Sequence, residues 1–523
     1  MQLDYWNHPL VVSAFRVRFR GRTPGIAAMV YFLALLCLGG LLQYNLANEP
    51  NVSWVRIYFV VLISIEVVIA ALYASSATFQ SIHSEVVNRT LDYQRTAAIG
   101  PHEILLGKML GEPAQGYMLA IAGLPLLVWC VAMGATTLPV FILLVVNLAT
   151  TSFLFAAAGL IHPLDTTTER SKSGGRSARA VGFLVAFIVA IQMLVAIPAL
   201  IQSPLGQAAL GLLVPAVSIY GVAVGNPYGY TLPLFGLGIP YLLVTPLVQI
   251  ALALLIVHSI ARRFVSPLNT ALSKPTAYAV LLVIDLLAAS MLAGSPMVSG
   301  ERVVAGFCLT HLISALVLTM MITPGRETLK TWIWRFRGRM PLWKDLLWGP
   351  RSSNLGALVV FCLMGGVIAL LLALAVDGRT MMASTTGDLM ANTARMVGVT
   401  FAVLLGFGSL FQWLFSIGSI GGFMYLAMLA MLSALPHLTG AYLDSAFLQS
   451  LSPSAQFASW LFGVPPALSI APTLVVYGAM FVIMQRMNER RISLGVAAVR
   501  RKLDTMLSEP NDVTPQLRSD GIR

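Results

Sequence analysis

Long apolar runs are the feature that most constrains how this chain can fold. The hydrocarbon core of a bilayer is about 30 Å thick, so a helix needs about 20 mostly apolar residues to cross it. Only 10% of the 523 residues are charged, against about 25% in a soluble domain. Twelve runs are long enough to cross, at residues 25–45, 55–80, 114–135, 138–162, 181–203, 232–261, 277–296, 303–323, 355–376, 394–418, 421–437 and 461–485. We therefore expect an all-α polytopic membrane protein with about 12 transmembrane helices.

Lysine and arginine residues predict the orientation, because cytoplasmic loops retain positive charge. With the N-terminus in the cytoplasm, all but four of the 33 Lys and Arg residues lie on the cytoplasmic side, the exceptions being Arg56, Arg302, Arg379 and Arg395. Both termini are therefore predicted to be cytoplasmic. Basic loops beside an anionic leaflet also account for the net charge of +12, so we expect a lipid bilayer and no nucleic acid as partner. The expected location is the cytoplasmic (inner) membrane of a bacterium or archaeon.

The same order of elements occurs in two halves of the chain. A basic cytoplasmic segment follows the second crossing of each half, at residues 81–113 and 324–353. We predict two six-helix permease-like halves, 1–263 and 264–491, in parallel tandem repeat. Twelve helices without internal symmetry remain the alternative.

Both ends of the chain mix basic and apolar residues. Residues 3–22 read as an interfacial helix before the first crossing, although a merely basic flank fits the pattern equally well. Residues 492–523 are predicted to form a basic amphipathic helix followed by a disordered tail.

No pattern typical of catalysis or metal binding occurs. The four cysteines lie in apolar segments without disulfide or metal spacing, and no nucleophile–base or paired-carboxylate arrangement is present. Gly100 to Met109 superficially resembles a phosphate loop, but six residues separate its glycines instead of four, and Met109 stands where Ser or Thr would bind magnesium. We expect no enzymatic activity, no metal and no cofactor in this chain.

The cytoplasmic segment 81–113 is unusually charged for a connection between two apolar runs. Residues 89–113 include seven ionisable side chains, counting histidine but not tyrosine, around the apolar run Ile104–Leu106. A lipid-facing helix would not carry these charges, and a solvated loop would not need the apolar run. We interpret the segment as a docking surface.

This segment resembles the corresponding region of the type-two ATP-binding cassette (ABC) permeases. The resemblance is close over about 25 residues and extends in helix order over residues 1–263. The sequence departs from the family at Arg89, where a glycine is usual, and at Ala97-Ala98, where Thr-Pro is usual. The matching residues are Glu85, Thr90, Leu91, Asp92, Pro101, Glu103, Ile104, Leu105, Leu106, Gly107 and Lys108.

The resemblance implies a function for the segment. A short helix around residues 85–98 would seat in a cleft of a cytosolic ABC ATPase subunit, and two such subunits would bind Mg-ATP and tilt the attached helices. The chain would then be the permease of an exporter. The aliphatic crossings suit a small hydrophobic or amphipathic substrate.

The second cytoplasmic segment matches the family less well. Thr90-Leu91 recurs as Thr328-Leu329, but tryptophans stand where polar residues or leucine are expected. Docking on a different partner and loss of the docking role are both open. The candidate docking residues are Glu327, Thr328, Leu329, Trp332 and Pro341.

A few polar residues inside crossings are candidates for a transport pathway. An ionisable group at the bilayer centre is costly and needs a partner or a water-filled cavity. The family resemblance places Glu66, Gln192 and His311 at the pathway, while packing between helices is the alternative for each and the expectation for Asp285.

Two other functions compete with an ABC permease. A twelve-helix secondary transporter driven by an ion gradient would have a characteristic Gly-to-Asp-Arg loop after its second crossing, which is not evident. A non-transporting membrane anchor for an ATPase is the third possibility.

Overall fold

The chain forms two compact units, Met1–Pro267 and Leu268–Arg523. This division falls four residues from the predicted boundary between residues 263 and 264. The computed structural model describes residues 9–20, 22–46, 53–88, 90, 93–94, 99–160, 211–234, 236–266, 269–294, 299–324, 328–329, 332, 343–349, 352–377, 386–417, 432, 436, 438–439, 441–443, 445–462 and 469–508.

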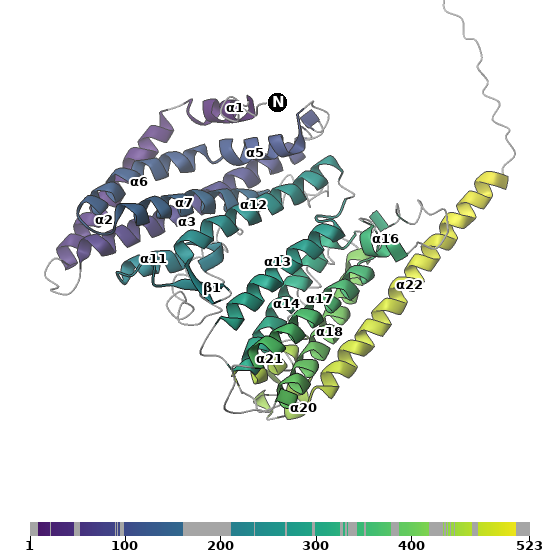
Figure 1. The fold of residues 1–523 in the computed structure, drawn as a ribbon. Coiled ribbons are helices and arrows are strands. Elements are labelled where there is room, and N and C mark those ends of the chain that lie inside the picture. The colour runs from purple at the N-terminus through teal and green to yellow at the C-terminus, as the bar shows by residue number, and fades with distance from the viewer. Residues whose placement is uncertain are drawn as a thin grey trace, which may run out of the picture. The chain divides into compact units, whose positions relative to one another are not determined.

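Among its described residues, unit 1 is mainly helical, with one small antiparallel hairpin. Figure 1 shows its long helices side by side, with α1 beside α5. The elements are α1 (Pro9–Arg18), α2 (Thr23–Leu46), α3 (Trp54–Val87), α5 (Pro101–Gly111), α6 (Ala114–Ala132), α7 (Leu138–Gly159), α11 (Ala216–Ala223), β1 (Thr231–Leu234), β2 (Leu237–Pro240) and α12 (Tyr241–Val265).

Every regular element among the described residues of unit 2 is a helix. Its elements are α13 (Lys274–Ala293), α14 (Gly300–Ile322), α16 (Trp343–Trp348), α17 (Leu355–Asp377), α18 (Thr386–Ile417), α20 (Ala446–Ser450), α21 (Pro453–Phe462) and α22 (Ala471–Ser508).

Nine helices of the described residues are long and apolar enough to cross a membrane. They are α2, α3, α6, α7, α12, α13, α14, α17 and α18. This confirms an all-α polytopic membrane protein, while the total of twelve crossings and the orientation of the termini stay predictions. The predicted crossing 181–203 lies outside the described residues, as does nearly all of 421–437.

Helix α3 is the centre of unit 1, where it packs against α2, α6, α7 and α11. Its buried residues follow helical spacing and change from large to small along the helix, from Phe59 and Leu62 to Ala70, Ala74 and Ala77. Small side chains let a neighbouring backbone approach closely. Helix α7 uses this space, because Gly159 lies directly against the backbone of α3.

The same pairs of crossings are in contact in both units. The second crossing packs on the third and fourth, which are α3 on α6 and α7 in unit 1, and α14 on α17 and α18 in unit 2. The fourth packs on the last helix of each unit, α7 on α12 and α18 on α22. A short helix before that last helix, α11 or α21, lies on the second crossing. These pairings agree with the predicted tandem repeat, which itself stays a prediction.

The structure changes the start of one predicted crossing. Residues 232–261 were expected to form one helix, but β1 and β2 pair antiparallel with Leu234 opposite Leu237, and α12 begins only at Tyr241. Gly236 between the strands has φ +84°, a conformation that strongly favours glycine. Proline and glycine in an apolar stretch therefore produce a hairpin where the apolar content alone predicts a helix.

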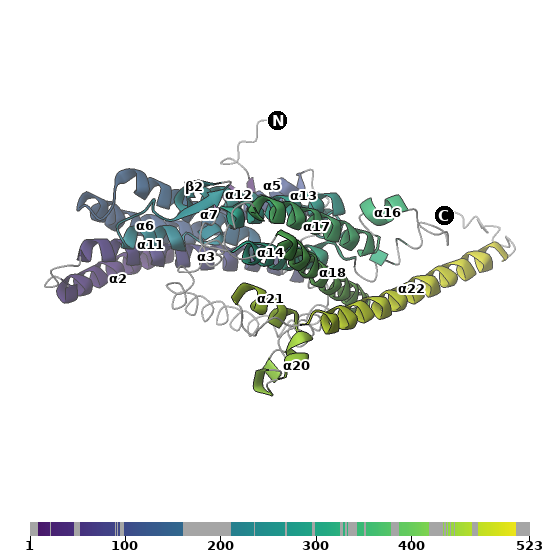
Figure 2. The ribbon, with the colours of Figure 1, turned by 60° about the horizontal axis from the view of Figure 1, so that its bottom comes forward.

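The last helix is longer than expected. A separate basic amphipathic helix was predicted from residue 492, but α22 is continuous over 38 residues and ends at Ser508, as Figure 2 shows. At about 1.5 Å per residue it is roughly 57 Å long, which exceeds the bilayer core of about 30 Å. Helix α18 supports the extension, because Asn488 donates to the Ser409 carbonyl at 3.2 Å and Arg491 lies 5.5 Å from the Trp413 ring centre.

Candidate functional site

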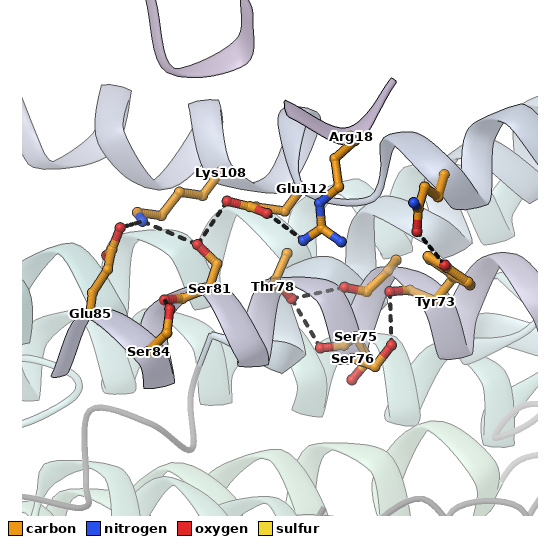
Figure 3. A network of polar contacts seen from close by, with 12 residues as sticks. Arg18, Tyr73, Ser75, Ser76, Thr78, Ser81, Ser84, Glu85, Lys108 and Glu112 are labelled. Carbon is orange, nitrogen blue, oxygen red and sulfur yellow. Dashed lines mark hydrogen bonds and ion pairs between the residues drawn. The ribbon is translucent and has the colours of Figure 1, made fainter. Parts of the chain in front are cut away.

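The candidate site lies in unit 1, where the end of α3 meets α5 and α1. Lys108 on α5 forms an ion pair with Glu85 on α3 and also donates to the Ser81 hydroxyl, with Nζ 3.3 Å from Oγ. Lys108 is only 4% exposed. These two predicted docking residues therefore join helices within the chain, and Figure 3 shows them facing each other.

The ion pair continues into a network that reaches α1. Ser81 donates to Glu112 Oε1 at 2.9 Å, and Glu112 Oε2 accepts a hydrogen bond from Arg18 at 2.8 Å (Figure 3). Alternating donors and acceptors thus connect three helices through five side chains. Charge-assisted hydrogen bonds of this kind are about twice as strong as neutral ones. The network fixes α1 and α5 to the end of α3.

The connection after α3 folds back onto this network. Gln94 donates to Glu85 Oε1 at 2.7 Å, and the Thr90 amide donates to the Glu85 carbonyl at 3.0 Å. The side chains of Thr90 and Tyr93 are exposed, Tyr93 at 79%. The connection therefore presents an exposed surface on a base that is fixed to α3.

The start of α5 explains three more predicted docking residues. The Gly100 amide donates to Glu103 Oε2 at 3.3 Å, which is one half of a capping box, and Pro101 occupies the first turn. Leu106 packs partly buried against the core cluster that contains Ile104. Glu103 and Pro101 thus start a helix, and the predicted Leu91 and Asp92 lie outside the described residues.

The second predicted docking segment is largely buried where it is described. Trp332 is 4% exposed and donates its indole N–H to Asp345 Oδ2 at 2.5 Å. Thr328 is 6% exposed, and Leu329 is half-buried. Trp332 therefore holds α16 in place, while Glu327 and Pro341 lie outside the described residues.

Lys274 is a structural anchor that sequence analysis missed. Its ammonium donates to the Leu346 carbonyl at 2.5 Å, to Ser352 Oγ at 2.7 Å and to the Ser353 carbonyl at 2.7 Å. The side chain is almost fully buried. Its sequence signal was weak, because one lysine before an apolar run is indistinguishable from an ordinary basic flank.

Arg18 and Glu112 were also missed as site residues. Glu112 follows Lys108 by four positions, so both side chains lie on one face of the same helical stretch. That spacing could have identified Glu112. Nothing in the sequence distinguishes Arg18 from the neighbouring arginines.

Glu66 sits in a closely fitted polar contact inside unit 1. Its Oε1 accepts a hydrogen bond from the Tyr31 hydroxyl of α2 at 2.9 Å. A Cβ atom at Gly123 of α6 would lie 1.8 Å from the same oxygen, so only glycine leaves room for the carboxyl group. Glu66 Oε2 has no hydrogen-bond partner among the described residues.

Unit 2 has a comparable contact between its first three crossings. His311 Nδ1 of α14 lies 2.8 Å from Asp285 Oδ2 of α13, and both side chains are at most 1% exposed. A Cβ atom at Gly365 of α17 would lie 2.3 Å from His311 Nε2. These contacts favour packing for Glu66 and His311, and the third pathway candidate, Gln192, lies outside the described residues.

Comparisons with known proteins add no relative. No protein-family model, no curated protein and no solved structure matches the chain. Within the described residues, no group of three or more His, Cys, Asp or Glu residues could hold a metal ion. Any functional conclusion therefore rests on the residues and contacts of this chain.

Proposed function

We propose that the chain is the membrane-spanning permease subunit of an ABC transporter that works as an exporter. The resemblance of residues 85–108 to type-two ABC permeases suggests this function. The observation that carries the proposal is the end of α3, where an exposed connection is fixed through Glu85, Gln94 and Lys108 to two helices. Such a base transmits force, whereas an unattached loop would absorb it.

In this proposal, ATP binding and hydrolysis occur in two separate cytosolic ABC ATPase subunits. Closure of the ATPases would push on the connection that contains Thr90 and Tyr93. The Glu85–Lys108 pair would pass the movement to α3, which is 34 residues long, and through α5 to α6. Helix α3 would move between two positions, and the nucleotide bound to the ATPases would set which position is more populated.

The proposed cargo is a small hydrophobic or amphipathic compound. The long helices are mainly aliphatic, and Glu66, Asp285 and His311, which lie near the middle of α3, α13 and α14, are buried in contacts between helices. A strongly charged cargo would need charged groups facing an open path. The proposed location is a bacterial or archaeal cytoplasmic membrane.

The docking role can be tested by isolating the full chain from its native membranes and measuring the ATPase activity that co-purifies. Tyr93→Ala should remove that activity, because Tyr93 is exposed on the connection that the proposal places against the ATPase. Tyr44→Ala is the matched control, since Tyr44 is 84% exposed at the other end of the unit's helices and should retain it. Unchanged ATPase activity in Tyr93→Ala and in Leu91→Asp would reject this docking surface.

A second candidate is a transporter driven by an ion gradient. The buried Asp285–His311 pair favours it, because secondary transporters carry ionisable groups in their crossings. Transport by the purified chain in proteoliposomes separates the two candidates. If the chain is an ABC permease, it should transport hydrophobic test compounds only when ATPase subunits and ATP are present. Transport driven by a proton or sodium gradient alone would establish the second candidate instead. ATP hydrolysis with no cargo dependence would indicate a non-transporting anchor.

A further inference from the structure

A charged pocket lies beside the network at the end of α3. It is open to one side and has a volume of about 480 Å³, which is within the usual range for small-molecule sites. Helices α1, α3 and α5 all contribute to its wall. The lining residues are Ser13, Ala14, Val17, Arg18, Glu85, Gly107, Lys108 and Glu112.

The charges on the pocket wall are balanced. Arg18 and Lys108 supply two cations, and Glu85 and Glu112 supply two carboxylates. A simple anion would be repelled by the carboxylates, and a simple cation would be repelled by Arg18 and Lys108. A ligand that carries both charges can match the wall at both ends.

Hydrogen-bonding capacity remains on three of these side chains. Glu85 Oε1 accepts from both Lys108 and Gln94, but Oε2 is buried and has no partner among the described residues. Lys108 uses two of its three N–H donors, and Arg18 gives one of its five donors to Glu112. A buried carboxylate oxygen without a donor is costly, so a ligand that supplies one would be favoured.

The position of the pocket points to a lipid as the source of that ligand. Helix α1 immediately precedes the first apolar helix, α2, and α5 immediately precedes α6, so the pocket lies beside the starts of two helices of membrane-spanning length. Val17 lines the pocket and is 73% exposed, and the nearby Phe19 is 38% exposed. Apolar side chains beside paired charges suit the junction between a headgroup and its acyl chains.

We propose that this pocket binds the phosphoethanolamine group of a zwitterionic membrane lipid. The phosphate is held by Arg18 and Lys108, and the primary ammonium donates to Glu85. A trimethylammonium group has no N–H to donate, and phosphatidylglycerol lacks the cation, so both of those lipids bind more weakly. This site does not depend on the proposed transport function.

The test uses the full chain in nanodiscs of phosphatidylcholine alone or mixed with phosphatidylethanolamine or phosphatidylglycerol. Native mass spectrometry then counts the lipids that stay bound. We expect one phosphatidylethanolamine per chain to be retained in preference to the other two lipids. Arg18→Gln should reduce this retention roughly tenfold, which is the effect expected from one charge-assisted hydrogen bond.

Two further variants separate binding from folding. Ala14→Phe fills the pocket while leaving every charge in place, and it should also abolish retention. Arg16→Gln is the matched control, because Arg16 is exposed on the same helix and does not line the pocket, so retention should be unchanged.

Soluble phosphoethanolamine added to the phosphatidylethanolamine nanodiscs distinguishes the sources of the group. Displacement of the lipid would mean that the site recognises the phosphoethanolamine group alone. No displacement would mean that the site requires the whole lipid. Both outcomes support a phosphoethanolamine site. Equal retention of all three lipids, or full retention in both Arg18→Gln and Ala14→Phe, would overturn the proposal.

Discussion

Gly159→Ala is the substitution for which the structure makes the sharpest prediction about unit 1. A Cβ atom at this position of α7 would lie 2.3 Å from the Ser75 carbonyl oxygen and 2.3 Å from Thr78 Oγ1 of α3. A backbone oxygen cannot rotate away, so α3 and α7 have to separate. The separation also strains the hydrogen bond from Thr78 Oγ1 to the Ala156 carbonyl, now 2.9 Å long.

The size of the effect follows from three contributions. Forcing a methyl group into a packed interface costs about 1–3 kcal/mol. Weakening one buried hydrogen bond adds about 0.5–1.5 kcal/mol. Alanine recovers at most about 1 kcal/mol through its higher helix propensity. With the full gain in helix propensity, the net destabilisation is roughly 0.5–3.5 kcal/mol. At about 2–4 °C per kcal/mol for a unit of this size, the midpoint of thermal unfolding should fall by about 1–14 °C.

Thiol labelling during heating measures this change within unit 1. In a background of Cys37→Ser, Cys308→Ser and Cys362→Ser, the only remaining thiol is Cys130, which is buried in α6. A dye that fluoresces on reaction with thiols then reports when unit 1 opens. Gly159→Ala should lower the midpoint of that signal.

Gly40→Ala is the matched control on α2, because a Cβ atom there would meet nothing within 4 Å. It should leave the midpoint unchanged or raise it slightly through helix propensity. A Gly159→Ala midpoint equal to the parent, or an equal fall in both variants, would refute the close approach of α7 to α3.

Three predictions concern unit 2. The measurement for each is the reaction of the same dye with the buried Cys308 thiol during heating, in a background of Cys37→Ser, Cys130→Ser and Cys362→Ser. Lys274→Met should destabilise the unit by about 1.5–3 kcal/mol, because three acceptors lose a charged donor. Lys344→Met is the control and should have little effect, because Lys344 is exposed on α16. Trp332→Phe should lower the stability of the unit by about 1–3 kcal/mol, because Asp345 Oδ2 loses its donor. Trp348→Phe is the control and should leave the stability nearly unchanged, because Trp348 is 54% exposed. Gly365→Ala should destabilise unit 2 in the parent protein but much less in a His311→Ala background, because removing the imidazole removes the 2.3 Å contact. Equal destabilisation in both backgrounds would contradict the contact.

The network at the end of α3 changes how the predicted docking residues are interpreted. Glu85 and Lys108 look like surface contacts in the sequence, but their mutual ion pair makes them the base of the segment. Glu103 caps its own helix, so a charge reversal there would disturb folding as well as docking. The exposed Thr90 and Tyr93 are better positions at which to test partner binding.

The sequence by itself determined the class of protein and the positions of most crossings. An apolar run of about 20 residues is read locally, because each residue exchanges water for hydrocarbon independently of its distant neighbours. All nine membrane-length helices of the described residues therefore correspond to predicted runs. The hairpin before α12 departs from the predicted helix because apolar content does not distinguish a strand from a helix.

Only the tertiary structure decided which polar groups are partners. Arg18 and Glu112 are 94 positions apart, and Lys274 and Ser352 are 78 apart, so no local pattern joins them. Glu66 and His311 are buried beside Gly123 and Gly365 because the backbones of third crossings come within contact distance there. Such contacts depend on how whole helices pack, and that packing is a property of many residues far apart along the chain.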